Sequence, residues 1–259
     1  TTVGQSIRLA GANPVELGSV SGCSSYEMRG ALSERTAAAM FVVSHHTVQY
    51  GMIPFRQFLK VAHDHGVPVI VDAAAEYNFE NYIEGGTDLV TCSGHKFLFG
   101  PTSGLVAGNK NLIKACRLQE KGIGRAMKVG KEGMVGLIAA LRHWKDRDLK
   151  VEHEETKKKA EQVISRLGNI RGLKASTAVD PTGNPITRVR IDIDPRESGL
   201  DAYVLSQELK EGKPPIISRD HQVEEEYLQL EMRFLDNTEI NQVCDRIKGI
   251  MDKKDTEKK

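Results

Sequence analysis

The sequence has 259 residues, 39% hydrophobic and 27% charged, which predicts a globular protein with one large core or two smaller ones. Its 36 Lys and Arg residues nearly balance its 35 Asp and Glu residues, which excludes the global basic excess of non-specific nucleic-acid binders. No apolar stretch approaches the roughly 20 residues of a membrane helix, and the four scattered cysteines predict a reducing compartment, the cytoplasm.

Apolar runs and helical patterns alternate in the first half of the chain. Short continuous apolar runs are typical of strands buried on both faces, and stretches with helical spacing separate them. The elements are expected at residues 37–43, 54–66, 67–72, 76–83 and 87–92. This alternation predicts an α/β domain with a mostly parallel sheet, in which ligands bind at the carboxyl ends of strands. A glycine-rich reversal over residues 97–108 predicts an added antiparallel strand.

The second half of the chain has a different pattern. A long helical pattern covers residues 131–166 and becomes highly charged, as a solvated helix face does. Alternating strands are then expected at 186–194 and 228–234, helices at 200–209 and 240–250, and a disordered tail at 253–259. We therefore predict a large domain over residues 1–150 and a small C-terminal α+β domain over residues 151–259.

Asp72 and Lys96 are the candidate catalytic residues. Each lies at the end of one of two consecutive core strands, so both side chains are expected in the same crevice. Pyridoxal 5′-phosphate (PLP) needs this pair, because a lysine binds it as a Schiff base and a carboxylate keeps its pyridine nitrogen protonated. Each residue alone has a structural explanation, since such a carboxylate can cap the next helix and most lysines are solvated. Together they predict a PLP-dependent enzyme.

The residues next to Lys96 also fit a cofactor loop. The hydroxyl of Ser93 can bind a phosphate, and Gly94 allows a close approach of the backbone. The alternative for the glycines that follow is a purely structural turn. No group of residues in the sequence has the spacing of a metal site.

Residues 92–105 (CSGHKFLFGPTSGL) resemble the lysine loop of the fold type I (aspartate aminotransferase-like) PLP enzymes. Asp72 is similar to the pyridine-nitrogen carboxylate of that family. His46 and Thr47 lie in a segment similar to the strand end that meets the cofactor ring and its 3′-oxygen. The resemblance implies that these residues and His95 bind the cofactor with Lys96, although a histidine at a strand end is often only a hydrogen-bonded loop residue.

Residues 124–131 (GRAMKVGK) are similar to the basic segment that the selenocysteine synthase (L-seryl-tRNA selenium transferase) group places after the lysine loop. Arg125 and Lys128 are three residues apart, so on a helix or turn they share a face and form an anion clamp. The alternative is an exposed basic start of a helix, although a helix N-terminus attracts anions rather than cations.

The resemblance implies an ammonia-lyase. Relatives in this group that do not act on tRNA include an ammonia-lyase that eliminates water and ammonia from a phosphorylated 2-amino sugar acid of the D-glucosaminate 6-phosphate type, giving a 2-keto-3-deoxy acid phosphate. Arg125 and Lys128 are then expected to bind substrate anions. Arg219 lies where this superfamily often binds the substrate carboxylate, with a surface ion pair as the alternative. A homodimer or larger homo-oligomer is also implied, without a nucleic-acid or membrane partner.

Several alternatives remain open at this stage. A class V aminotransferase or a cysteine desulfurase has a similar lysine loop, but neither Cys116 nor Cys244 lies on a predicted mobile loop as a desulfurase requires. A selenium transferase acting on seryl-tRNA and a non-catalytic PLP-fold protein are the others. Only 71 residues precede Asp72, fewer than the family has, and residues 1–22 show no phosphate-binding turn. We expect the N-terminal part of the large domain to be missing from this chain, or part of the site to be built differently.

Overall fold

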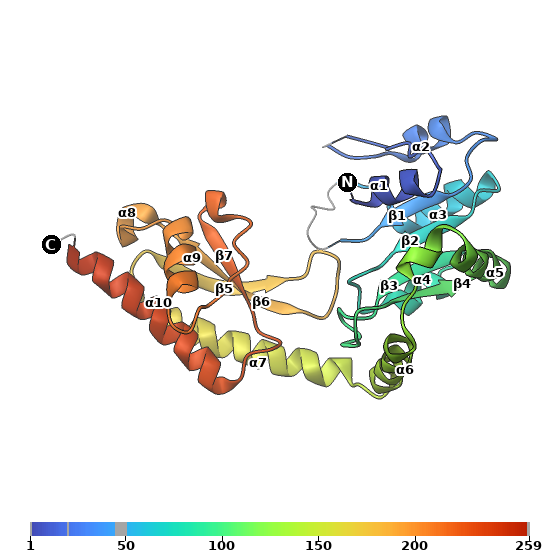
Figure 1. The fold of residues 1–259 in the computed structure, drawn as a ribbon. Helices are drawn as coiled ribbons and strands as arrows, with labels where there is room; N and C mark the ends of the chain where they lie inside the picture. Colours follow the sequence, from blue (N-terminus) through green and yellow to red (C-terminus); the bar gives the residue numbers. More distant parts are fainter. Residues whose placement is uncertain (1, 20, 45–50, 258–259) are drawn as a thin grey trace. The chain divides into compact units, whose positions relative to one another are not determined.

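The computed structural model describes residues 2–19, 21–44 and 51–257 (Figure 1). The chain forms two compact units, Thr1–Arg147 and Asp148–Lys259, and each is described here by itself. The boundary between the two units lies close to residue 150, the predicted end of the large domain. Within the described residues, no helix combines the length and the hydropathy needed to cross a membrane.

The first unit contains a four-stranded sheet in the order β1-β2-β3-β4. The strands are β1 (Ala39–Val42), β2 (Val69–Asp72), β3 (Leu89–Ser93) and β4 (Gly104–Gly108). β1, β2 and β3 are parallel, and β4 pairs antiparallel with β3. Val69, Val71 and Val90 are at most 1% exposed, because strands between two covering layers bury both faces. The mostly parallel α/β sheet and its antiparallel addition are confirmed.

Helices surround this sheet in the first unit. They are α1 (Thr2–Leu9), α2 (Ser25–Ala31), α3 (Phe55–Asp64), α4 (Phe79–Glu84), α5 (Lys110–Leu118) and α6 (Lys131–Lys145), with the 3-10 turns η1 (Gln119–Lys121) and η2 (Ile123–Met127). α3 buries Phe58, Leu59 and Ala62, and the ring of Phe58 lies edge-on to that of Phe41 on β1 at 5.1 Å. This aromatic contact fixes α3 on the sheet.

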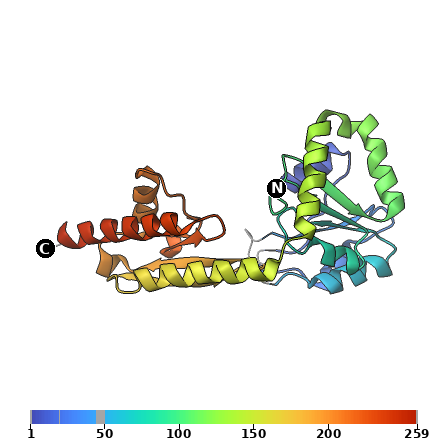
Figure 2. The ribbon, with the colours of Figure 1, turned by 90° about the horizontal axis from the view of Figure 1, so that it is seen from below.

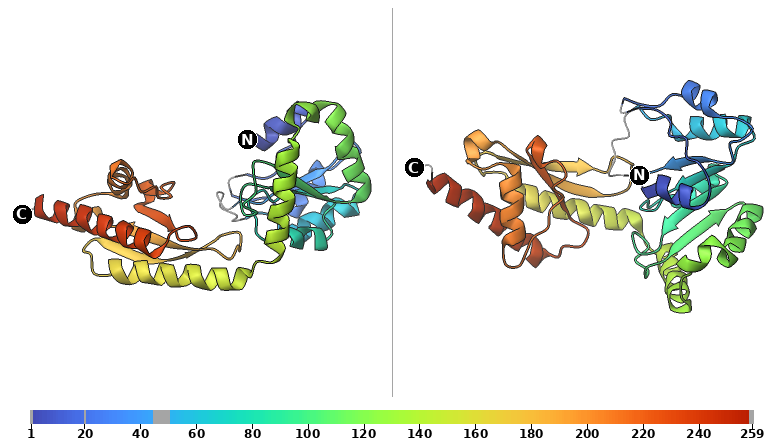
Figure 3. Two further views of the ribbon diagram at one scale, coloured as in Figure 1. Left: turned by 60° about the horizontal axis from the view of Figure 1, so that its bottom comes forward. Right: turned by 45° about the horizontal axis from the view of Figure 1, so that its top comes forward.

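α5, η1, η2 and α6 form an arch beside the sheet (Figures 2 and 3). Several large apolar side chains of the arch are exposed. They are Leu118, Ile123, Met127, Met134, Val135 and Ile138, with exposed fractions from 43% to 73%. An apolar surface of this kind marks a site of association in many proteins.

The second unit packs helices on one face of an antiparallel sheet with the order β5-β6-β7. Its elements are α7 (Leu149–Leu167), β5 (Leu173–Val179), β6 (Thr187–Ile193), α8 (Pro195–Ser198), α9 (Ala202–Glu211), η3 (Val223–Glu225), β7 (Tyr227–Glu231) and α10 (Asn237–Glu257). α7 and α10 pack against each other (Figure 1), and both join α9 and the sheet in one apolar core. Val189 and Ile191 of β6 are completely buried in that core.

Two predictions about the second half are wrong, and one strand was not predicted. The helix expected over 131–166 is two helices, because the carboxylate of Asp148 accepts hydrogen bonds from the N–H groups of Lys150 and Val151 and so begins α7. The tail expected to be disordered from residue 253 continues α10 through Glu257. β5 was not predicted, since its small and polar residues give little alternation.

Candidate active site

Asp72 and Lys96 come from neighbouring strands. β2 ends at Asp72, which lies beside Thr91 in the parallel register with β3. Lys96 follows the end of β3, Ser93, by three residues and is exposed in a turn. The structure therefore brings the two candidate residues to the carboxyl edge of the same pair of strands, where parallel sheets bind ligands.

One carboxylate oxygen of Asp72 is held by hydrogen bonds and the other is not. Oδ1 accepts from the N–H of Ala74 at 3.1 Å and from the hydroxyl of Thr91 at 3.4 Å. Among the described residues, Oδ2 has no hydrogen-bond partner. The helix-capping alternative for Asp72 is wrong, because the first helix after Asp72 is α4, which begins at Phe79 and has Asn78 as its N-cap. Thr91, which orients this carboxylate, was not identified from the sequence.

Charges from both candidate residues act on the thiol of Cys92. Burial raises the pKa of Cys92 to about 11; the charge of Lys96 lowers it, while those of Asp72 and Glu76 raise it further. The charged groups of Lys96, Asp72 and Glu76 therefore all lie within electrostatic reach of Cys92 on β3. Glu76 is only 3% exposed and was also not identified from the sequence.

Two glycines shape the turn that carries Lys96. The N–H of Gly94 donates to Ser103 O at 2.9 Å, and the N–H of Gly100 donates to Gly94 O at 2.7 Å. A Cβ at Gly94 would lie 2.1 Å from Ser103 Oγ and 2.9 Å from Leu137 Cδ1. The close approach of Leu137 on α6 and of Ser103, the residue before β4, therefore favours glycine at position 94, and the turn is a fixed part of the fold.

The other predicted cofactor ligands are less defined. Ser93 is half-buried, and its N–H donates to Ala74 O at 3.2 Å, which ties the end of β3 to the residues after β2. His95 is exposed beside Lys96. His46 and Thr47 lie outside the described residues, so their roles stay predictions.

Arg125 and Lys128 lie on the arch. Both are exposed, and in the described part of the chain neither forms an ion pair. Arg125 belongs to η2, whereas Lys128 follows it with an extended backbone (φ −63°, ψ 125°). Leu137 is six residues into α6, about 9 Å along the helix axis from its start, and it is Leu137 that contacts the lysine turn. Among the described residues no hydrogen bond or ion pair joins Arg125 or Lys128 to Lys96, and the role of this pair stays a prediction.

Arg219 belongs to the second unit. Its backbone bridges to Gln229 beside β7, and its side chain is half-buried. Burial lowers the pKa of Arg219, and the nearby charge of Arg188 lowers it further, while Glu231 and Asp180 oppose the shift. Arg188 itself is 3% exposed and pairs with Asp180 at 3.0 Å and Glu231 at 3.3 Å.

Arg233 completes this basic group. It binds both oxygens of Glu231, at 2.9 and 3.0 Å. Three guanidinium groups, those of Arg188, Arg219 and Arg233, therefore surround two carboxylates, those of Asp180 and Glu231. No ion pair satisfies Arg219 among the described residues, so this cluster has one uncompensated positive charge.

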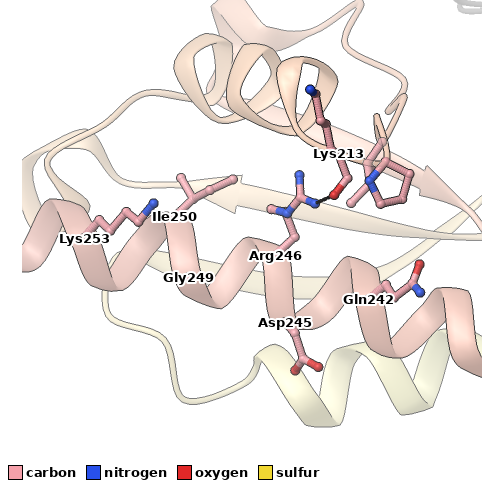
Figure 4. A pocket seen from close by; sticks show the side chains of 9 residues that line it. Lys213, Gln242, Asp245, Arg246, Gly249, Ile250 and Lys253 are labelled. Carbon is pink, nitrogen blue, oxygen red and sulfur yellow. Dashed lines mark hydrogen bonds between the residues drawn. The ribbon is translucent and has the colours of Figure 1, made fainter.

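A separate pocket of about 520 Å³ lies in the second unit (Figure 4). It is formed between α10 and the segment around Lys213, whose carbonyl accepts a 2.5 Å hydrogen bond from Arg246 Nη2. The carboxylate of Asp245 pairs with Arg166 of α7 instead. None of the predicted cofactor or substrate residues lines this pocket.

Residues 2–236 match the family model described as SelA, L-seryl-tRNA selenium transferase. The chain belongs to this family. A relative from Salmonella typhimurium, the D-glucosaminate-6-phosphate ammonia lyase, is 36% identical over 96% of this chain and 66% of its own length. The 5′-C-glycyluridine monooxygenase-decarboxylase of a Streptomyces species is 38% identical over 89% of this chain and 58% of its own length.

A solved structure of D-glucosaminate-6-phosphate ammonia-lyase shares the fold of this SelA-family chain. Its TM-score is 0.79 at 35% identity, covering 96% of this chain and 66% of that one. The chain therefore has the PLP-dependent fold type I expected from the sequence. It spans somewhat less than two thirds of the length of these relatives.

Proposed function

We propose that the protein is a PLP-dependent ammonia-lyase that acts on a phosphorylated 2-amino sugar acid of the D-glucosaminate 6-phosphate type. The convergence of Asp72 and Lys96 at the ends of β2 and β3 carries this proposal. The relative that is 36% identical over nearly the whole chain supports the reaction class, since it is named as an ammonia lyase.

The residues of the first unit fit PLP. Asp72 Oδ2 is free, among the described residues, to accept a hydrogen bond from the pyridine nitrogen, while Thr91 and Ala74 fix the other oxygen. The ammonium group of Lys96 is exposed and forms no ion pair in the described chain. When bound, PLP withdraws electrons from the substrate α-carbon and makes its proton removable.

Lys96 has two roles in this proposal. Its Nζ holds the cofactor covalently, and as a free amine it takes the proton from the substrate α-carbon. Asp72 keeps the pyridine nitrogen protonated. The 3-hydroxyl of the substrate then leaves as water, and hydrolysis returns one water, so the net products are ammonia and a 2-keto-3-deoxy acid phosphate. Ser93, His95, His46 and Thr47 complete the proposed cofactor site.

The substrate carries a phosphate and a carboxylate, and the protein has basic groups for both. Arg125 and Lys128 are the proposed phosphate ligands, because they are exposed cations without a carboxylate partner in the described chain. Arg219 is the proposed carboxylate ligand, since it supplies the uncompensated charge of the Arg188 cluster. A planar guanidinium binds a carboxylate through two parallel hydrogen bonds.

We also propose a cytoplasmic homo-oligomer. The four cysteines are all free thiols, which agrees with a reducing compartment. The exposed apolar residues of the arch, such as Met127 and Val135, are the proposed contact between subunits. Arg125 and Lys128 lie on the same arch, so subunit association would bring the clamp close to a second copy.

An assay of purified protein with PLP tests the proposed reaction. We expect ammonia and keto acid in equal amounts from D-glucosaminate 6-phosphate, and neither product from serine or cysteine. Replacing Arg125 by Ala should lower kcat/KM for the phosphorylated substrate about 10- to 100-fold, the value of a lost charge-assisted hydrogen bond. Arg142→Ala, which removes an exposed arginine of α6, is the control. Equal losses on the unphosphorylated analogue would reject the phosphate clamp.

A second candidate follows from the Streptomyces relative, whose 38% identity is as high as that of the lyase. The name of that relative describes oxygen incorporation and loss of carbon dioxide. Measuring oxygen consumption and carbon dioxide release alongside ammonia separates the two reactions. Ammonia without oxygen consumption is the result expected here.

A further inference from the structure

Arg147 contacts the turn that carries Lys96 through a hydrogen bond and an aromatic ring. It follows α6, and its Nη1 donates a 3.0 Å hydrogen bond to the carbonyl of Phe97, the residue after the lysine. The same guanidinium lies over the rings of Trp144, Phe99 and Tyr77, with its central carbon 4.8, 5.0 and 5.9 Å from their centroids. One cation thus contacts the turn on both sides of Leu98.

Aromatic rings near Arg147 form a cluster made of Tyr77, Phe97 and Trp144. The ring centroids of Tyr77 and Phe97 are 4.1 Å apart, and those of Tyr77 and Trp144 are 5.5 Å apart. Tyr77 lies between β2 and α4, so this aromatic cluster joins the segment after β2 to the turn after β3. Its arrangement therefore fixes the two strand ends that carry the proposed catalytic residues.

Phe99 shows that this turn is held in place. Its φ is +54°, a left-handed backbone that residues with a side chain rarely adopt, and its N–H donates to Lys96 O at 3.1 Å. Such a conformation persists only where the surroundings stabilise it. Phe99 is 51% exposed, so burial of its ring contributes little to stabilising this conformation. The guanidinium of Arg147 lies over that ring.

We propose that Arg147 is a positioning residue that holds the Lys96–Phe99 turn closed and so places Nζ of Lys96 opposite Asp72. The proposal rests on the proposed role of Lys96 only for its effect on PLP. Its effect on the turn itself is independent of any cofactor. Lysine can replace Arg147 only in part, because it keeps the positive charge but lacks the flat guanidinium that stacks on rings and donates at its edge.

Hydrogen exchange on the protein without PLP tests the effect on the turn. In Arg147→Gln, the amides of a peptide covering residues 94–103 should exchange at least about tenfold faster, since those of Phe99 and Gly100 close the turn. Arg142→Gln, on the exposed side of α6, should leave them unchanged. Arg147→Lys should lie between wild type and Arg147→Gln, which keeps the test decisive where the glutamine variant does not fold.

Combining Arg147→Gln with Phe99→Gly provides a second test of the role of Arg147. Glycine adopts a positive φ without strain, so Arg147→Gln should accelerate exchange much less in Phe99→Gly than in the wild type. Equal acceleration in both backgrounds would overturn the proposal, as would wild-type exchange rates in Arg147→Gln.

Loading with PLP then tests the link to Lys96. Bound PLP is followed by the absorbance band of its Schiff base with the protein. The variant Arg147→Gln should need about tenfold more PLP to saturate this band, and the pH midpoint of the band should differ from that of wild type. Arg142→Gln should match wild type in both properties. If wild type itself forms no band, the proposed function fails and the exchange result still judges the role of Arg147. If wild type forms the band and Arg147→Gln reproduces it, the positioning role is rejected.

Discussion

Breaking the ion pair of Asp180 and Arg188 should destabilise the second unit strongly. Asp180 is 0% and Arg188 3% exposed at the side chain, and their charged atoms are 3.0 Å apart. Three hydrogen bonds reach Asp180 Oδ1, from the N–H and hydroxyl of Thr182 and from Asn184, while Arg188 binds Oδ2. Asp180→Asn keeps the oxygen that these three donors need and turns an N–H donor toward Arg188.

The size of the effect follows from these distances. Two charges 3.0 Å apart attract by about 5 kcal/mol at an effective dielectric constant of about 20, and dehydration of both groups offsets much of this. Removing one partner of a buried pair costs about 3 to 5 kcal/mol because the other charge is left uncompensated. Arg188 keeps Glu231 at 3.3 Å, so we expect about 3 kcal/mol.

Urea unfolding followed by circular dichroism at neutral pH measures this loss. Asp192→Asn is the matched control, because the Arg190–Asp192 pair lies on the same strand but is 38% and 34% exposed, and should cost less than about 1 kcal/mol. Replacing Asp180 and Arg188 together by Asn and Met should recover most of the stability. Equal small losses in Asp180→Asn and Asp192→Asn would refute the reasoning.

The pH dependence of the Asp180→Asn effect has a definite sign. Burial acts to raise the pKa of Asp180, but hydrogen bonds from Thr182 and the bond and charge of Arg188 outweigh it and hold that pKa below 3.8. The carboxylate therefore stabilises the folded state fully above about pH 4, and this contribution is lost as the pH falls through the lowered pKa. The difference between wild type and Asp180→Asn should be constant from pH 7 to about pH 4 and shrink below it.

Two further predictions concern the candidate active site. Gly94→Ala should lower PLP affinity by about tenfold or more, because its Cβ would meet Ser103 and Leu137. The control Gly30→Ala, with open space around it, should keep the affinity of wild type. Retained affinity in Gly94→Ala would contradict the tight turn. Iodoacetamide at pH 8 should label the exposed Cys116 and leave Cys92 unmodified, since burial raises the pKa of Cys92 to about 11. Mass spectrometry of the digested protein identifies the labelled cysteine. Rapid labelling of Cys92 would contradict its burial.

The sequence predicted the part of the fold whose pattern is strongest. Buried parallel strands give continuous apolar runs, so β1, β2 and β3 were found, and the polar residues at their ends led to Asp72 and Lys96. β5 and the break between α6 and α7 were missed. In β5 the residues are mostly small or polar and only Leu173 is buried, so the apolar pattern is weak. At Asp148 one side chain begins a new helix inside a helical pattern that continues on both sides.

The residues that support the site were harder to predict. Thr91, Glu76 and Arg147 have ordinary side chains at unremarkable positions in the sequence. Their roles depend on the register of β2 with β3 and on the path of α6, which brings Arg147 to Phe97, 50 residues away in the chain. Such contacts over long separations leave no local pattern in a single sequence.

Mapping the bound cofactor tests the central claim most directly. Purified protein is incubated with PLP, reduced with borohydride and digested, and the modified peptide is identified by mass spectrometry. We predict a pyridoxyl group on Lys96 in wild type, none at this position in Lys96→Ala, and a weaker and altered absorbance band in Asp72→Asn. A pyridoxyl group on another lysine, with Lys96 unmodified, would contradict the account.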